Sequence, residues 1–321
     1  MAVDAAPAPR ILILRRDNIG DLVCTTPLIA ALRAQLPRAW LGALVTTYNA
    51  EVLAGNPALD EVFVHEKLKH RTVSLLSHVG SRLGQLSRLR QRKIDSVLVP
   101  ASSPQALKLA RSLKPGRVLA APAGAPAQQH EVERTFALGG SLGVTGTPGP
   151  LRIFPDGKKV LELRQKIGAG PIVAIHISAR RPAQRWPLER YAALAAHLAK
   201  EARVLLLWAP GASDDPRHPG DDAAAAGVLR EVGGSAVTPV PTADLKMLIA
   251  ALSLAELVIC PDGGAMHLAA ALGKPVVALF GDSPVERWRP WGVPHRVLRP
   301  ESRNLADLAL EPVLEAARSL G

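Results

Sequence analysis

The chain has 321 residues, a formal net charge of +11 and 48% hydrophobic residues. Two domains are expected at this length, because single cores usually stop growing before it, and the apolar content excludes a disordered chain. The positive charge favours a polyanionic partner, which can be nucleic acid, an anionic membrane face or a phosphorylated substrate. Aromatic residues make up only 3% of the chain, and no RNP-like or zinc-finger pattern occurs, so we expect no nucleic-acid partner.

The sequence shows no signal for export or for metal binding. No apolar run reaches the roughly eighteen residues that span a bilayer, and residues 1–10 lack the apolar core of a signal peptide. We therefore expect a cytoplasmic protein. Cys24 and Cys260 stand far apart in apolar segments, with no CxxC pair and no His/Cys cluster at metal-ligand spacing, so we expect buried thiols and no metal.

The first half of the chain alternates short apolar runs with helical patterns. Strands are predicted at 10–14, 41–46, 62–64 and 96–99, and helices at 22–35, 74–92 and 131–142. Strands that alternate with helices indicate a parallel sheet. Residues 120–155 are rich in Pro, Gly and Ala, and we place the domain boundary at their end, which gives a first domain of residues 1–155.

The second half repeats this alternation. Strands are predicted at 173–177, 204–208, 257–260 and 276–280, and helices at 188–201, 223–231, 242–252 and 265–272. Residues 156–321 are therefore expected to form a second α/β domain around a parallel sheet, whose last helix is a candidate to pack back on the first domain.

The loops that leave predicted strands are the first places to look for ligands, because open α/β sheets bind ligands beyond the carboxyl ends of their strands. In the first such loop, Asp17 and Asn18 precede Gly20, which permits a tight turn, and Asp21 falls at the start of a predicted helix. An Asp in that place is commonly an N-cap worth about 1 kcal/mol. The alternative is a carboxylate that accepts a proton from an acceptor hydroxyl.

The loop from Asp262 to His267 joins a predicted strand to a predicted helix. Gly263 and Gly264 carry no side chains, so backbone N–H groups at the helix start can approach a phosphate, whose charge the helix dipole favours. His267 is either a further donor to a diphosphate or a packed side chain. Asp262 either caps the helix or orders the loop.

A third loop, residues 179–187, carries Arg180, Arg181 and Arg185. Arginines can clamp a diphosphate through bidentate hydrogen bonds, although a run of charge is more often a solvated face. No GxGxxG follows the first strand, and no GxxxxGK[ST], GxSxG or HExxH occurs. These absences argue against a nicotinamide dehydrogenase, a P-loop NTPase, an α/β-hydrolase and a zinc protease.

At these loops the sequence resembles glycosyltransferase family 9, the ADP-heptose:lipopolysaccharide heptosyltransferases, over nearly the whole chain. The segments that carry the resemblance are residues 11–14 running into 18–21, residues 185–191, and residues 262–275 with Phe280 and Gly281 after them. The resemblance implies a GT-B type α/β fold, in which two Rossmann-like domains with parallel sheets face a central cleft. It also implies inverting, metal-independent transfer without a cofactor, with the acceptor on the first domain and the nucleotide sugar on the second.

Carried over by position, the resemblance makes Asp21 the catalytic base, with Asp17, Asn18 and Gly20 on the acceptor side. The donor-binding residues that it implies are Ser178, Arg181, Arg185, Asp214, Asp262, Gly263, Gly264, Ala265, Met266 and His267. Asp214 or Asp215 is the candidate for an acid that binds the ribose.

Two departures from the family pattern bear on the donor site. The chain has Gln184 where the family often has Lys, so Arg181 or Arg185 would have to supply the charge. It also has Gly263 where the family often has Thr, which removes one hydroxyl donor.

The leading interpretation is a transferase that moves heptose from ADP-heptose to a lipid-linked or phosphorylated glycan acceptor on a lipopolysaccharide core. One alternative keeps the fold with another nucleotide sugar or another glycan acceptor, and a second is a non-catalytic nucleotide-sugar-binding protein. The basic stretch 67–93 either faces the anionic inner face of the inner membrane, which would make the protein peripheral there, or forms a solvated helix face.

Overall fold

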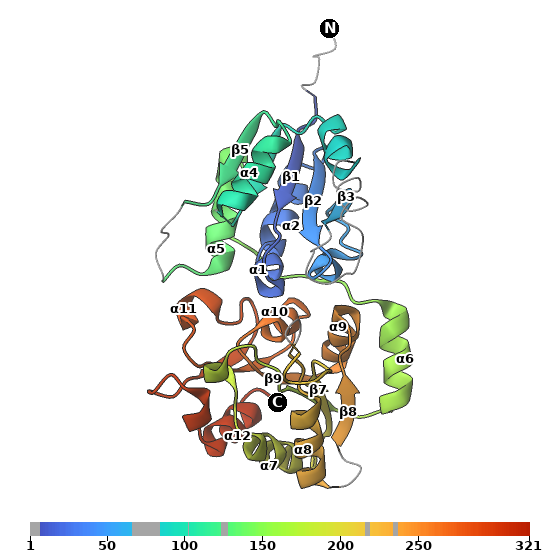
Figure 1. Cartoon of the computed structure of the whole chain (residues 1–321), viewed down its shortest axis with the longest axis vertical. Helices are drawn as coiled ribbons and strands as arrows, with labels where there is room; N and C mark the ends of the chain where they lie inside the picture. Colours follow the sequence, from blue (N-terminus) through green and yellow to red (C-terminus); the bar gives the residue numbers. More distant parts are fainter. Residues whose placement is uncertain (1–6, 66–83, 102, 123–127, 216–218, 234–236) are drawn as a thin grey trace. The chain divides into compact units, whose positions relative to one another are not determined.

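The computed structural model describes residues 7–65, 84–101, 103–122, 128–215, 219–233 and 237–321 (Figure 1). The chain forms two compact units, residues 1–149 and 150–321. The division falls a few residues before the boundary expected at residue 155. Leu151 and Ile153 are buried, and the N–H of Ile153 donates to the carbonyl of Ala271 at 3.4 Å, so this segment already belongs to the second unit.

The first unit contains a five-stranded parallel sheet in the order β3-β2-β1-β4-β5 (Figure 1). Its strands are β1 Arg10–Leu14, β2 Trp40–Thr46, β3 Glu61–His65, β4 Ser96–Val99 and β5 Arg117–Ala120. The central strand β1 is almost entirely buried, as expected for a parallel sheet covered on both faces. The four predicted strands of this half are confirmed, and β5 is an additional edge strand.

The helices of the first unit are α1 Ile19–Val23, α2 Thr26–Gln35, α4 Pro104–Ser112 and α5 Glu131–Phe136, with 3₁₀ turns at η1 Ala50–Leu53 and η3 Ala137–Leu142. Residues 84–91 are also helical, and the rest of the helix predicted over 74–92 lies outside the described residues. The single helix predicted over 22–35 is wrong, because Pro27 has no N–H to donate to Val23. The hydroxyl of Thr26 donates to that carbonyl instead, at 2.8 Å, and the helix divides there.

The second unit contains a six-stranded parallel sheet in the order β11-β10-β9-β6-β7-β8. Its strands are β6 Ile172–His176, β7 Arg203–Trp208, β8 Val237–Pro241, β9 Leu257–Pro261, β10 Val276–Leu279 and β11 His295–Leu298. Four of these were predicted within one residue at each end. The edge strands β8 and β11 were not.

The helices of the second unit are α6 Gly157–Ile167, α7 Leu188–Leu198, α8 Asp222–Val232, α9 Leu245–Leu254, α10 Gly264–Ala271, α11 Val285–Trp288 and α12 Leu310–Arg318, with 3₁₀ turns at η4 Pro182–Gln184 and η5 Leu305–Asp307. The last helix, α12, packs against α7, β10 and β11, and Val313 and Ala317 belong to the core of its own unit. The expected packing of α12 back on the first domain stays a prediction.

Both cysteines are free and buried, as expected. Among the residues that the structure describes, no helix combines the length and apolar character required for a membrane span. The predicted α/β class with two parallel sheets is confirmed.

Burial of leucine on the helices provides a test of this packing. Leu194 on α7 is fully buried in the core of the second unit, whereas Leu161 on α6 is 65% exposed. We expect Leu194→Ala to lower the free energy of unfolding by about 2–5 kcal/mol, because it leaves a cavity. The matched change Leu161→Ala should alter it by less than about 0.5 kcal/mol. Urea unfolding of both variants measures the difference, and equal losses would contradict the burial assigned to Leu194.

Candidate active site

The topology of the first unit places its functional edge between β1 and β4. The chain runs outward from β1 to β2 and β3 and then returns to β4 on the other side of β1, so the loops after β1 and β4 diverge. Sheets of this kind bind ligands at such a switch point. A cavity of about 200 Å³ lies there, lined by Leu14, Arg16, Asp17, Ala101, Ser103, Gln105 and Ala106.

A buried arginine organises the loop after β1. The side chain of Arg15 is only 1% exposed, and its guanidinium contacts three carboxylates. Nε lies 3.0 Å from Asp17 Oδ1, and Nη2 lies 2.7 Å from both Asp21 Oδ1 and Glu131 Oε1. The two Nη2 contacts are hydrogen bonds, whereas the contact of Nε with Asp17 is an ion pair without hydrogen-bond geometry. Sequence reasoning singled out Asp17 and Asp21 but missed Arg15 and Glu131.

Asp21 is not the N-cap of α1, and that interpretation is wrong. Asn18 occupies the cap position, and Asp21 stands two residues inside the helix. Its Oδ1 accepts from Arg15 and its Oδ2 accepts from the side-chain amide of Asn18 at 2.9 Å. These two hydrogen bonds hold the carboxylate in one orientation. Because it is 12% exposed, it still reaches the surface.

Asp17 lies beside Asp21 and lines the 200 Å³ cavity. Burial, aided by the negative charge of Asp21, raises the pKa of Asp17 to about 6, although the charge of Arg15 opposes the shift. Carboxylates that differ in environment at one site can serve different roles.

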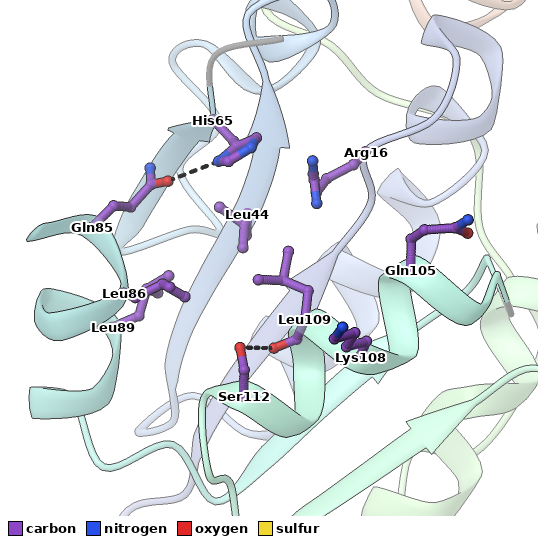
Figure 2. Close-up of a pocket in the computed structure, with 10 residues that line it drawn as sticks. All are labelled: Arg16, Leu44, His65, Gln85, Leu86, Leu89, Gln105, Lys108, Leu109 and Ser112. Carbon is purple, nitrogen blue, oxygen red and sulfur yellow. Dashed lines mark hydrogen bonds between the residues drawn. The ribbon is translucent and has the colours of Figure 1, made fainter. Parts of the chain in front are cut away.

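The first unit has a second cavity of about 320 Å³, whose lining residues Figure 2 shows. Leu44, Leu86, Leu89 and Leu109 form its apolar walls, and on one side Nδ1 of His65 donates to Oε1 of Gln85 at 3.2 Å. Arg16, Gln105 and Lys108 provide polar groups on the other side. Arg16 and Gln105 line both cavities, so the two are neighbours.

The second unit has its own switch point, between β6 and β9. The loops that leave these strands carry residues 177–187 and 262–264, which are two of the three loops that the sequence indicated. The loop after β10 joins them. A Cβ on Gly281 would overlap the carbonyl oxygen of Ala183, so the glycine permits close contact between the two loops.

Gln184, the residue that departs from the family pattern, is the centre of this cluster. Its side-chain nitrogen donates to Asp262 Oδ2 at 2.7 Å and to the hydroxyl of Ser283 at 2.9 Å. Its side-chain oxygen accepts from Nε of Arg181 at 3.3 Å. Arg181 also hydrogen-bonds to Ser283 and lies 3.2 Å from Asp282, both on the loop after β10. The amide therefore orients the Arg181 guanidinium beside the Asp262 loop.

Asp262 orders the loop and does not cap α10, whose N-cap is Gly263. Gly263 has extended backbone, and no atom lies within 4 Å of the position that a Cβ would take. Gly264, Ala265 and Met266 form the first turn of α10, whose N–H groups have no partner inside the helix. His267 is buried, and its ring meets Trp288 edge to face at 5.9 Å between ring centres.

Three predicted donor residues lie apart from this cluster or serve other contacts. Arg185 lies 3.5 Å from the buried Asp221 and donates to the carbonyl of Ala179 at 3.1 Å, so it ties the loops after β6 and β7 together. The hydroxyl of Ser178 accepts from the N–H of Ala209 at 2.8 Å. Asp214 is exposed on the loop after β7. Among the residues described, no group of three His, Cys, Asp or Glu side chains is arranged to hold a metal ion.

Comparisons with known proteins identify the family of this chain and its fold. The family model described as glycosyltransferase family 9 (heptosyltransferase) matches residues 118–316, which is more than half of the chain. Lipopolysaccharide heptosyltransferase 2 of Escherichia coli K12 is 26% identical over 319 residues, covering 90% of this chain and 88% of that protein.

Two solved structures share the fold. The family 9 glycosyltransferase of Veillonella parvula superimposes with a TM-score of 0.82 at 21% identity and covers 99% of both chains. The E. coli ADP-heptose LPS heptosyltransferase II gives a TM-score of 0.79 at 21% identity, covering 97% of this chain and 98% of that one. At these identities the superpositions concern the fold alone.

A buried histidine at the end of β6 gives this region a testable pH dependence. Burial lowers the pKa of His176 from 6.5 to about 4. Between these values the unfolded chain binds more protons than the folded one, so this contribution to stability is lost as the pH falls through the window. We expect the free energy of unfolding of wild type minus that of His176→Gln to decrease by about 2–3 kcal/mol from pH 7 to pH 4.5. Parallel urea titrations measure it, and a constant difference would contradict the assignment.

Proposed function

The chain belongs to glycosyltransferase family 9, and from this membership we propose that it transfers heptose from ADP-heptose to a lipopolysaccharide core, with inversion and without a metal ion. The observation that carries the proposal is the fixed, partly exposed carboxylate of Asp21 at the carboxyl edge of the first sheet. A general base needs such a group, held where a substrate hydroxyl can reach it.

We assign the donor diphosphate to the start of α10. The N–H groups of Gly264, Ala265 and Met266 together with the helix dipole favour a negative charge at this end. Gly263 leaves open space in front of them. We assign the cationic contact to Arg181 and not to Arg185, because Gln184 holds Arg181 beside the Asp262 loop whereas Arg185 pairs with Asp221. A phosphate would compete with Asp282 for the guanidinium of Arg181.

The remaining residues expected to bind the donor are Ser178, Asp214, His267 and Asp262. Ser178 and Asp214 follow β6 and β7, which are neighbours in the second sheet. We expect them to contact the nucleoside, with Asp214 on the ribose hydroxyls. His267 is expected to contribute a hydrogen bond to the diphosphate, and Asp262 to keep the loop in place.

The reaction follows from these groups. An acceptor hydroxyl attacks the anomeric carbon of the donor sugar while its proton passes to Asp21, and the bond from that carbon to the diphosphate oxygen breaks. ADP leaves with the bonding electrons, and the α10 amides and Arg181 stabilise the charge that develops on it. A single displacement of this kind inverts the anomeric centre.

The acceptor is expected on the first unit, at the region formed by the two cavities. Asp17, Asn18 and Gly20 belong to the same loop as Asp21, and Arg16 and Lys108 bring positive charge for a phosphorylated or acidic sugar. We place the reaction at the cytoplasmic face of the inner membrane. The basic stretch 67–93 lies mostly outside the described residues, so its contact with that membrane stays a prediction.

The donor assignment can be tested at Gly263. Because a side chain there meets no protein atom within 4 Å and the backbone is extended, Gly263→Val should fold normally. Its branches should occupy the space of the phosphates, so we expect ADP affinity to fall tenfold or more, a loss of about 1.4 kcal/mol or greater, with adenosine affinity nearly unchanged. Titration calorimetry measures both ligands.

The control is Gly157→Val, the same change at the first residue of α6, where a Cβ also meets no atom within 4 Å. It should leave both affinities at the wild-type value. Equal losses of ADP and adenosine in Gly263→Val would mean that the residue shapes the pocket generally, and full ADP affinity would place the diphosphate elsewhere.

The role of Asp21 can be tested by Asp21→Asn. The amide keeps the size of the carboxylate but cannot accept the proton, so we expect turnover with ADP-heptose to fall about 10²–10⁴-fold while ADP affinity stays unchanged. ADP release in the presence of acceptor measures turnover, with and without EDTA. Full activity of the folded variant would remove Asp21 from the mechanism, and loss of wild-type activity in EDTA, restored by a divalent ion, would overturn metal independence.

A further inference from the structure

We propose that Arg15 and Glu131 are positioning residues for Asp21: Glu131 shares one guanidinium nitrogen of Arg15 with Asp21, which fixes the Asp21 carboxylate and offsets part of the charge that Arg15 exerts on it. The inference rests on the proposed role of Asp21 as the base. Neither residue touches the reacting atoms in this arrangement, and both act through Asp21.

Asp21 and Glu131 both accept a hydrogen bond from the same nitrogen of Arg15. Nη2 of Arg15 lies 2.7 Å from an oxygen of Asp21 and 2.7 Å from an oxygen of Glu131. Neither carboxylate therefore has sole use of that donor. Asn18 takes the other oxygen of Asp21, and the hydroxyl of Thr25 donates to the Asp21 carbonyl at 2.9 Å. The two carboxylate oxygens are thus held by Arg15 and Asn18, and the backbone of the same residue is held by Thr25.

Burial strengthens the interactions between these charges. Arg15 is 1% exposed and Glu131 is 0% exposed, so water screens their charges little. Desolvation alone would lower the pKa of Arg15, but the charges of Asp17, Asp21 and Glu131 raise it, so the guanidinium stays protonated. Buried charges persist only where partners compensate for the lost hydration. Arg15 is therefore a permanent cation next to Asp21, the proposed base.

Glu131 is itself fixed by structure distant in sequence. It is the first residue of α5, whose cap is formed by the ring of His130 and the carboxylate of Glu133. Its second oxygen lies 3.3 Å from Nε of Arg134, and Arg134 donates to the carbonyl of Pro100 after β4 at 3.0 Å. The network thus connects the ends of β1 and β4 with α5.

The charge arrangement predicts how Glu131 affects Asp21. The charged and titratable groups around Asp21 are Arg15 and Asp17 on the preceding loop, Cys24 at the end of its own helix, and Glu131 on α5 with Arg134 behind it. Burial raises the pKa of Cys24, so this thiol is neutral. Glu131 offsets part of the positive charge that Arg15 exerts on Asp21. Removing its charge should therefore make Asp21 a weaker base, and removing Arg134 should make it a stronger one.

The test compares pH profiles of kcat/KM in four variants. Glu131→Gln keeps the shape and removes the charge, and it leaves two cations against two carboxylates, so the cluster remains balanced. We expect its acid limb to move to lower pH by about half a unit to one unit, with kcat reduced. Glu131→Asp keeps the charge but shortens the reach, so kcat should fall while the limb stays in place. Arg134→Gln should move the limb to higher pH.

Glu133→Gln is the matched control on the same helix. Glu133 is exposed, and glutamine can still close the capping box, so its profile should equal that of wild type. Unchanged limbs in both Glu131→Gln and Arg134→Gln, with the variants folded by circular dichroism, would overturn the inference. If Glu131→Gln fails to fold, Arg134→Gln decides alone, because the guanidinium of Arg134 is partly exposed.

A measurement without turnover separates this inference from the proposed function. Titration of the Asp21 carboxyl carbon by ¹³C NMR, assigned through Asp21→Asn, should show the same opposite shifts in Glu131→Gln and Arg134→Gln. If Asp21→Asn proves fully active, the proposed base is wrong although these shifts can still occur. If Asp21→Asn is inactive and the shifts are absent, only the positioning role fails.

Discussion

The carboxyl edge of each parallel sheet determines where chemistry can occur in this protein. Parallel strands all end at the same edge, and at a switch point the two neighbouring loops diverge and leave space between them. In the first unit this point lies between β1 and β4, where Arg15 contacts its three carboxylates and where the smaller cavity lies. In the second unit it lies between β6 and β9, and it holds Gln184, Asp262 and the start of α10.

The two candidate sites differ in their charged groups. In the first, the charge of Arg15 is divided among three carboxylates, one of which is Asp21, the base that we propose. In the second, Gln184 orients Arg181 beside the amides at the start of α10, where we propose that the diphosphate binds. The side-chain amide of Gln184 has both a donor and an acceptor, so its nitrogen binds Asp262 while its oxygen binds Arg181. A lysine at this position has no acceptor for the arginine.

Sequence patterns were sufficient for the central strands and for the loops that follow them, because buried parallel strands are continuous apolar runs. They failed at β5, β8 and β11, all of which are edge strands. β8 contains Pro239 and Pro241, and β11 contains His295 and Arg296, residues that an edge tolerates and that weaken the apolar signal. The motif residues were identified, but Arg15, Glu131 and Ser283 were not. Their contacts span up to 116 positions in sequence, and no local pattern records them.

The most direct test of the account is analysis of the product of the purified protein with ADP-heptose and a lipopolysaccharide core acceptor. Mass spectrometry should show one added heptose, and NMR of the new linkage should show an anomeric configuration opposite to that of the donor. Binding of ADP-heptose without transfer to any core acceptor would contradict the proposed activity. Transfer with retained configuration would contradict the single displacement in which Asp21 is the base.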